Sequence, residues 1–267
     1  MTRGCVCALV LGLCGAVFAR CVAAQDMMRH VDLSSPDMTS AEMTRTDVEA
    51  ALRAATPSHP ADFTSKRLSG LDLSGLDLSG AIFRAARLNK TSLADAILDR
   101  AVLDQAWLLQ ADLRRASLAG ASLFATQMQR ANLDGANLSG ARIVADMTGA
   151  SLIGASLAAA RMGADMKNQS MGLMRAVLKF AKLDRANLRG ADLSRADIEF
   201  ASLKQANLTG ASLVGADLGG ADLTGAVIAG TDFAGADLVS ARLVAPIGLD
   251  AAKNLDKAQN LDRAVRN

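Results

Sequence analysis

The sequence contains no tyrosine, only one tryptophan and only two histidines among its 267 residues. Aromatic residues make up 3% of the chain, so small aliphatic side chains must fill most of any core. The formal net charge is +2, which is too small to indicate a nucleic-acid partner. The sequence shows no Cys/His cluster with metal-ligand spacing, no nucleophile–base set and no phosphate or dinucleotide fingerprint. We therefore expect no catalysis, no metal and no cofactor.

Cysteine is absent from the chain after its first 21 residues, where all four cysteines lie. Arg3, an apolar run over residues 6–19 and small residues at 22–24 are typical of a secretory signal peptide. The apolar run is short for a membrane span. We predict that residues 1–24 are removed and that the mature chain is periplasmic or secreted, without cysteine and without a stable membrane span. An uncleaved apolar anchor is the alternative.

From Leu71 to Ala245 the sequence repeats every five residues. The unit is a small residue, a short polar residue, Leu and two variable residues, as in residues 116–120 (Ala-Ser-Leu-Ala-Gly). This alignment gives 35 units, of which 25 have Leu at the third position and 29 have Ala at the first. So sharp a period indicates a repeat architecture in which each unit buries a face on its neighbours.

A period of five fits neither a strand, with its period of 2, nor a helix, with its period of 3.6. We interpret each unit as turning one corner, with its first and third residues inward and the others outward. Each buried Leu then contributes roughly 1.5–3 kcal/mol before entropy is subtracted. The second residue, mostly Asp, Asn or Ser, can accept a hydrogen bond from a nearby amide, and the fifth residue, often Gly, suits a positive φ.

The A-(D/N/S)-L-x-x tandem resembles the pentapeptide repeat family. The resemblance implies an all-β solenoid, a right-handed quadrilateral β-helix with four units, or 20 residues, in each coil. About nine coils at the ~4.8 Å spacing of neighbouring strands would form a rod on the order of 40 Å long. The predicted domains are a signal peptide over 1–24, an N-terminal segment with a capping helix over 25–62, the repeat β-helix over 63–245 and a C-terminal helical cap over 246–267.

Short α-helices are expected at both ends of the solenoid, because terminal repeats need a cover. Thr46 as N-cap and Glu49 three residues later fit a capping box that opens a helix over 46–55. After Pro246, apolar residues three apart predict one or two short helices, with Asp250 as a candidate N-cap. Members of the family often dimerise through this end, which would cover an exposed coil edge. A homodimer through the C-terminal end is therefore a prediction.

The five-residue period is interrupted in one region. The units at 141–144 and 160–163 have four residues each, and the pattern is irregular over residues 163–175. The unit centres in this region are the methionines Met147, Met162, Met166 and Met171. Methionine fills irregular gaps, so a bent or loosened coil is expected, and a binding loop or groove is the alternative.

Counting four units per coil assigns the outward residues to sides of the rod. The count predicts one acidic pair and one basic pair of sides, and an exposed stack of Phe180 on Phe200. The candidate interaction residues are the acidic column Asp197, Asp217 and Asp237 and the basic group Arg142, Arg161 and Lys182. The column fits turn-capping carboxylates on a solvated face, and a cation site is the alternative, because like charges so close repel.

Apolar residues occupy four second positions that are usually polar: Ile82, Ile97, Val102 and Trp107. An exposed apolar patch usually marks a contact. We expect the helix over 46–55 to cover them, with a partner protein as the alternative.

These observations favour an exported, non-catalytic structural or protein-interaction scaffold whose protein partner is unknown. The resemblance supplies an alternative, a DNA-mimicking inhibitor of a type II topoisomerase such as gyrase, because some members of the family act in that way. That mechanism needs an acidic, DNA-like surface. The net charge of +2 and the predicted export both argue against it.

Overall fold

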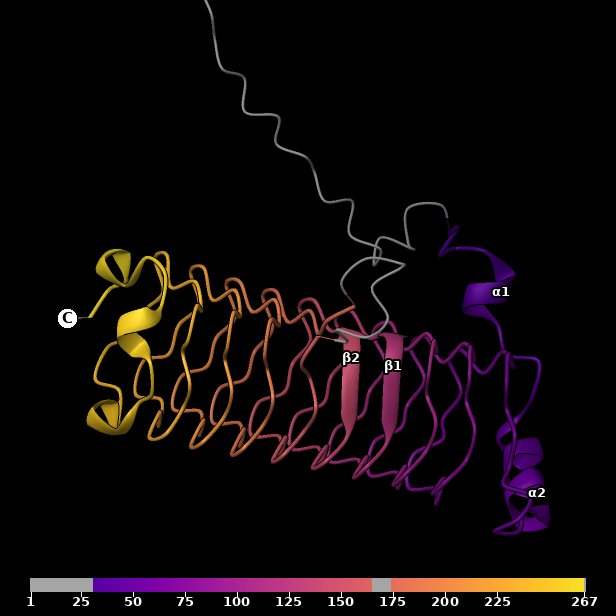
Figure 1. The fold of residues 1–267 in the computed structure, drawn as a ribbon. Coiled ribbons are helices and arrows are strands. Elements are labelled where there is room, and N and C mark those ends of the chain that lie inside the picture. The colour runs from indigo at the N-terminus through magenta and orange to yellow at the C-terminus, as the bar shows by residue number, and fades with distance from the viewer. Residues whose placement is uncertain (1–30, 165–173, 267) are drawn as a thin grey trace, which may run out of the picture.

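The computed structural model describes residues 31–164 and 174–266. These residues form an elongated rod of stacked coils, with helices α1 and α2 at one end and short turns at the other (Figure 1). The predicted signal segment 1–24, with Cys5, Cys7, Cys14 and Cys21, lies outside the described residues. None of the helices in the described ranges is both long and apolar enough to cross a bilayer.

Parallel pairing joins residues that lie one coil apart in the sequence. Asp72 pairs with Ser92, Ser92 with Asp112 and Asp112 with Asn132, so each step along the rod advances 20 residues. Nine such bridges lead from Asp62 through Ile82, Val102, Ser122, Arg142, Arg161, Asp192, Ser212 and Asp232 to Lys253. The coil of four five-residue units and the number of coils were both predicted correctly.

Continuous strands are scarce, because each unit makes a single bridge before the chain turns. In the described residues, two strands longer than one bridge occur, β1 (Ser122–Gln127) and β2 (Arg142–Asp146), and they pair in parallel. The four-residue unit 141–144 lacks a corner residue, so β2 runs straight into the next unit. The expectation of a loosened coil here is wrong for β2, since the deletion extends the pairing.

The core is filled by the first and third residues of the units, as predicted. The third residues form columns of fully buried Leu, such as Leu133 and Leu152, and the first residues are buried Ala. Three units have Thr at the first position, and each hydroxyl donates to a buried carbonyl. These bonds run from Thr91 to Leu68, from Thr126 to Leu103 and from Thr231 to Leu208, at 2.7–2.9 Å. No polar group is left unpaired at these corners, which keeps the column solid.

The fifth residue of a unit has a left-handed backbone whether or not it is glycine. Gly140 has φ +67°, and Lys90, Arg100 and Phe180 have φ between +56° and +58°. Sequence analysis associated this conformation with glycine alone, but the corner geometry imposes it on other residues too. A side chain there carries a strain of about 1 kcal/mol.

The N-terminal end of the rod is closed by α2 (Arg45–Ala54), which follows the short helix α1 (Pro36–Thr39). The predicted helix was correct but its cap was wrong by two residues. Thr44 is the N-cap, and its hydroxyl and backbone amide form a capping box with Asp47. Val48 is fully buried in the end of the core, and Leu52 packs against it.

The C-terminal end is closed by three single turns of 3-10 helix, not by the predicted α-helices. They are η3 (Leu249–Ala251), η4 (Leu255–Lys257) and η5 (Leu261–Arg263). Asp250 lies within the first turn of η3, whose N-cap is Gly248. Successive sides of this last coil pair with residues 20, 21, 22 and 23 positions earlier, because each unit is one residue longer. The extra residue tilts Leu255 and Leu261 over the core.

Candidate interaction surfaces

The outer sides of the rod are built from the second, fourth and fifth residues of the units. A second residue with a short polar side chain accepts a hydrogen bond from the backbone amide of the fourth residue. Asp72 accepts from Ser74, and Asn137 accepts in the same way from Ser139, at 3.0 and 3.2 Å. The turn-capping role predicted for these residues is confirmed, and Asp and Asn perform it alike.

The register changes at the irregular stretch. Arg142 pairs with Arg161 after 19 residues, and Arg161 pairs with Asp192 after 31. Residues between Ala164 and Ala176 are therefore an insertion within one unit, where sequence analysis counted two further units. Most of this insertion, with Met166 and Met171, lies outside the described residues. Met147 and Met162 are fully buried unit centres.

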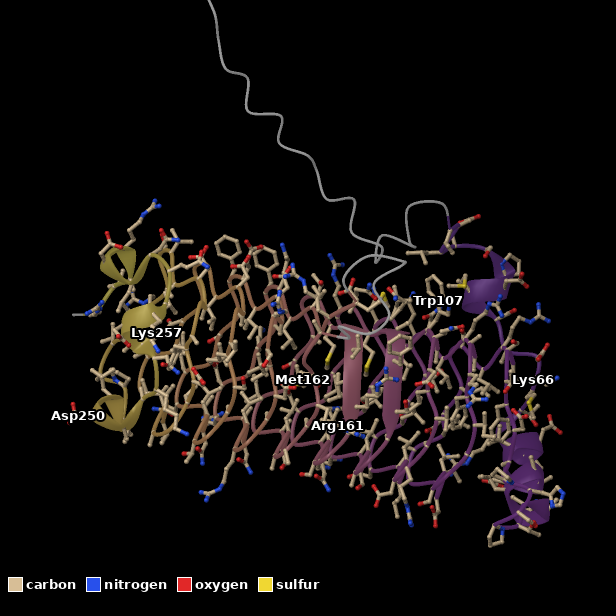
Figure 2. The ribbon with its side chains drawn as sticks, in the orientation of Figure 1. Lys66, Trp107, Arg161, Met162, Asp250 and Lys257 are labelled. Carbon is tan, nitrogen blue, oxygen red and sulfur yellow. The ribbon has the colours of Figure 1, made fainter. Side chains whose placement is uncertain are left out.

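This register moves every later unit two sides around the rod, and the predicted acidic and basic pairs of sides are wrong. Lys182 pairs with Ser151 and lies on a different side from Arg142 and Arg161. Arg161 and Met162 lie beside β2 in the middle of the rod (Figure 2). Next along the row from Arg161 is Asp192, so this row combines both signs of charge.

Asp197, Asp217 and Asp237 do form a column, as predicted, but on a side that also carries arginines. We call this side the aspartate side. Its second residues, in order along the rod, are Arg67, Arg87, Trp107, Gln127, Asp146, Val177, Asp197, Asp217, Asp237 and Gln259. The side is basic at its N-terminal end and acidic towards its C-terminal end. Two oppositely charged halves on one side do not make a DNA-like surface.

Asp197 is the most enclosed carboxylate of the column, with 3% of its surface exposed. Arg175 lies 2.9 Å from it, Lys179 lies 3.4 Å from it, and Lys179 also forms an ion pair with Glu199. Single carboxylate oxygens of Asp197, Glu199 and Asp217 lie within 4.8 Å of one another, a spacing at which a cation could bind. Arg175 and Lys179 already supply cations to this group.

Asp217 has a different environment. Its carboxylate accepts a hydrogen bond from the Gly219 amide at 3.1 Å, and no Lys or Arg among the described residues forms an ion pair with it. Burial raises the pKa of Asp217, and the negative charges of Glu199, Asp197 and Asp237 raise it further. The column is therefore compensated at Asp197 and uncompensated at Asp217.

Phe180 and Phe200 stack as predicted, one coil apart at the edge of the aspartate side. Their ring centroids are 5.2 Å apart, their planes differ by 8°, and 58% and 56% of their surfaces are exposed. Sequence analysis missed a second aromatic contact, in which the Arg142 guanidinium lies 4.2 Å from the centre of the Phe124 ring. Phe124 stands at a fourth position on the same side, one coil earlier, and this offset could have revealed the pair.

The four apolar second residues do not form one patch. Ile82 and Val102 pair on one side, whereas Ile97 pairs with Asp77 and Trp107 with Arg87 on two others. Helix α2 does not cover them, contrary to prediction. It lies across the end of the rod, where Arg45 donates to the carbonyls of Asp72 and Ser74. The open end of the core exposes more apolar surface than scattered side chains do, so it binds the helix.

One hollow of about 240 Å³ lies between the α1 segment and the rod. Its lining residues are Leu33, Met38, Thr39, Gly70, Asn89, Lys90, Leu109 and Gln110. Asn89 holds the α1 segment in place, because its amide donates to the Met38 carbonyl at 3.0 Å. Lys90 is the only ionisable residue in this lining, so the hollow contains no acid–base pair for catalysis.

Comparison with known proteins gives one clear sequence match. The family model described as pentapeptide repeats, in eight copies, matches residues 61–99, 96–140, 173–210 and 206–243. No curated protein sequence matches this chain.

Solved structures of similar proteins include HetL from the cyanobacterium Nostoc, a pentapeptide repeat protein involved in the regulation of heterocyst differentiation. It is 28% identical over 84% of this chain and 94% of its own, with a TM-score of 0.45. QnrB1, a plasmid-mediated fluoroquinolone resistance protein, is 13% identical over 75% of this chain and 89% of its own, with a TM-score of 0.47. Because both TM-scores are below 0.5, these likenesses support no inference about partners.

Proposed function

This chain belongs to the pentapeptide repeat family, and from that premise we propose that it is an exported, non-catalytic scaffold that binds other proteins through the sides of its rod. We further propose the right-handed winding that family membership implies. The observation that carries the proposal is the filled interior. The inward residues of the described coils are buried Ala and Leu, so the polar and charged groups lie on the outer sides.

A regular outer surface suits binding better than catalysis. Catalysis needs several groups that converge on one reacting atom in a water-excluded site. On this rod, neighbouring side chains of a row stand side by side on paired residues and point outwards together. Such rows present a broad, rigid surface, which lowers the entropy lost when a partner binds.

Export is part of the proposal because residues 1–24 have the three parts of a signal peptide. A homodimer through the C-terminal end is also proposed. Ile247, Leu249 and Val265 in the last coil leave 58%, 44% and 41% of their surfaces exposed. Exposed apolar residues beside an unpaired coil edge favour association with a second copy.

The test of this proposal is the location and state of the protein in cells. A copy tagged at its C-terminus should be recovered outside the cytoplasm with Gln25 as its first residue. A matched variant, L11R, interrupts the apolar run and should stay in the cytoplasm at full length. Cross-linking in cells should join the exported protein to another protein.

Intact cytoplasmic protein that inhibits gyrase supercoiling would replace this proposal with the DNA-mimic inhibitor. The mixed charges of the aspartate side oppose that result, because a DNA mimic needs a continuous row of negative charge.

A further inference from the structure

We propose that Phe180, Phe200, Asp217 and Asp237 form a docking corner for a segment of another protein that carries both apolar and cationic side chains. The inference rests on the proposed scaffold function and specifies the chemistry of the partner. It depends on two features of the corner that exceed what the fold requires.

The first feature is the pair of exposed rings. Phe180 and Phe200 occupy fifth positions with φ +57°, a backbone conformation that glycine adopts without strain at Gly210 and Gly230. Phenylalanine at these corners adds strain and exposes more than half of each side chain. The Phe200 ring also lies over Gly220, where an added Cβ would stand 2.6 Å from the ring. The fold would tolerate glycine in place of either ring, so the rings serve another purpose.

The second feature is the charge of Asp217 and Asp237. Each uses one carboxylate oxygen to accept the backbone amide two residues on, from Gly219 at 3.1 Å and Val239 at 3.0 Å. Asn207 caps its turn in the same way without a charge. Among the described residues, no Lys or Arg forms an ion pair with Asp217 or Asp237, although they are paired neighbours in the column. Adjacent like charges are unfavourable, so a cation from outside would be attracted.

The surface between these features is low. Gly219 has no side chain at a fourth position, and its neighbours there are Glu199 on one coil and Val239 on the next. An added Cβ at Gly219 would touch Asp217 Oδ1 at 3.3 Å and Val239 Cγ1 at 3.4 Å. The floor beside the Phe200 ring is therefore lined by carboxylate and small apolar groups. A Lys or Arg side chain can lie there with its charge near Asp217, while an apolar neighbour covers the rings.

The experiment measures the binding of short synthetic peptides to the purified protein by fluorescence anisotropy. One peptide alternates Leu and Lys, and two controls of equal length alternate Leu and Glu or Ser and Lys. We expect the Leu–Lys peptide to bind at least about tenfold more tightly than either control, and to weaken as salt is added. The variant D217N/D237N, which keeps both turn caps, and the variant F180S/F200S should each weaken binding about tenfold.

Matched variants on other sides control for charge and for apolar surface. D62N/D77N removes two turn-capping carboxylates elsewhere, and V214S removes an exposed apolar side chain, and neither should change binding. Thermal unfolding checks that every variant is folded.

Three results would overturn the docking corner. These are equal binding by all variants, a self-association that F180S/F200S abolishes, and a divalent cation that binds to the wild type and blocks the peptide. Failure of the peptide experiment with export and cross-linking intact would leave the scaffold function standing and remove only this corner.

Discussion

The second residue of each unit shows how one side chain can serve two purposes that conflict. Asp and Asn both cap the turn through one oxygen, but only Asp adds a negative charge. Asp77 is well accommodated, because hydrogen bonds from Ser79 hold its pKa below the usual range. Asp217 is not, because burial and three acidic neighbours raise its pKa. The same residue type in the same place in the repeat is stabilising in one coil and costly in another.

The pH dependence of stability should reveal this difference at Asp217. Because its folded pKa is raised, its contribution is fully present below its ordinary value of 3.8 and is lost as the pH rises through the raised value. D217N cannot ionise and keeps the cap, so it should unfold at higher urea concentration than the wild type at neutral pH. The gain should shrink as the pH is lowered towards about 3.

D77N is the matched control and should behave in the opposite way. The lowered pKa of Asp77 means that its charge stabilises the protein above the ordinary value and loses that effect as the pH falls. D77N should therefore be less stable than the wild type at neutral pH. Equal urea midpoints for D217N and the wild type across this pH range would contradict the prediction.

Among the elements, α2 shows how tertiary packing selects one of two local signals. The sequence offers Thr44 with Asp47 and Thr46 with Glu49, and both pairs have the spacing of a capping box. The helix begins at Arg45, which places Val48 in the end of the core and lets the Arg45 guanidinium reach the Asp72 carbonyl. The sequence fits either start, and contact with the coil end decides between them.

Substitution of the two threonines should distinguish the caps. T44A removes the hydroxyl that accepts the Asp47 amide and should lower the free energy of α2 unfolding by about 1 kcal/mol. T46A lies inside the first turn and should be neutral or slightly stabilising, since Ala favours helix. Hydrogen exchange of the α2 amides measures both effects. A larger loss for T46A than for T44A would restore the cap predicted from sequence.

The whole molecule is a rod with two unlike ends. At the N-terminal end, α2 covers the core with a buried Val48, whereas the C-terminal end has three 3-10 turns whose leucines are only partly buried. The C-terminal coil also has no further coil with which to pair, and apolar residues are exposed in it. The two ends therefore differ in how readily they can accept another copy of the chain.

A double substitution in the last coil should test the proposed dimer. I247K/V265K places two like charges where the chain exposes apolar side chains, and it should halve the mass measured by analytical ultracentrifugation. I97K changes an exposed apolar residue on a side of the rod and should leave the mass unchanged. A monomeric wild-type protein would remove the dimer from the proposal.

The sequence by itself determined the repeat, the inward Ala and Leu, the turn-capping second residues and the stack of Phe180 on Phe200, because each depends on spacing within or between regular units. Only the tertiary structure decided which sides carry which charges after residue 164. Backbone pairing joins Arg161 to Asp192 across the insertion, and that pairing passes over units that a count along the chain includes. Side assignment therefore depends on hydrogen bonds between distant residues, which no local pattern encodes.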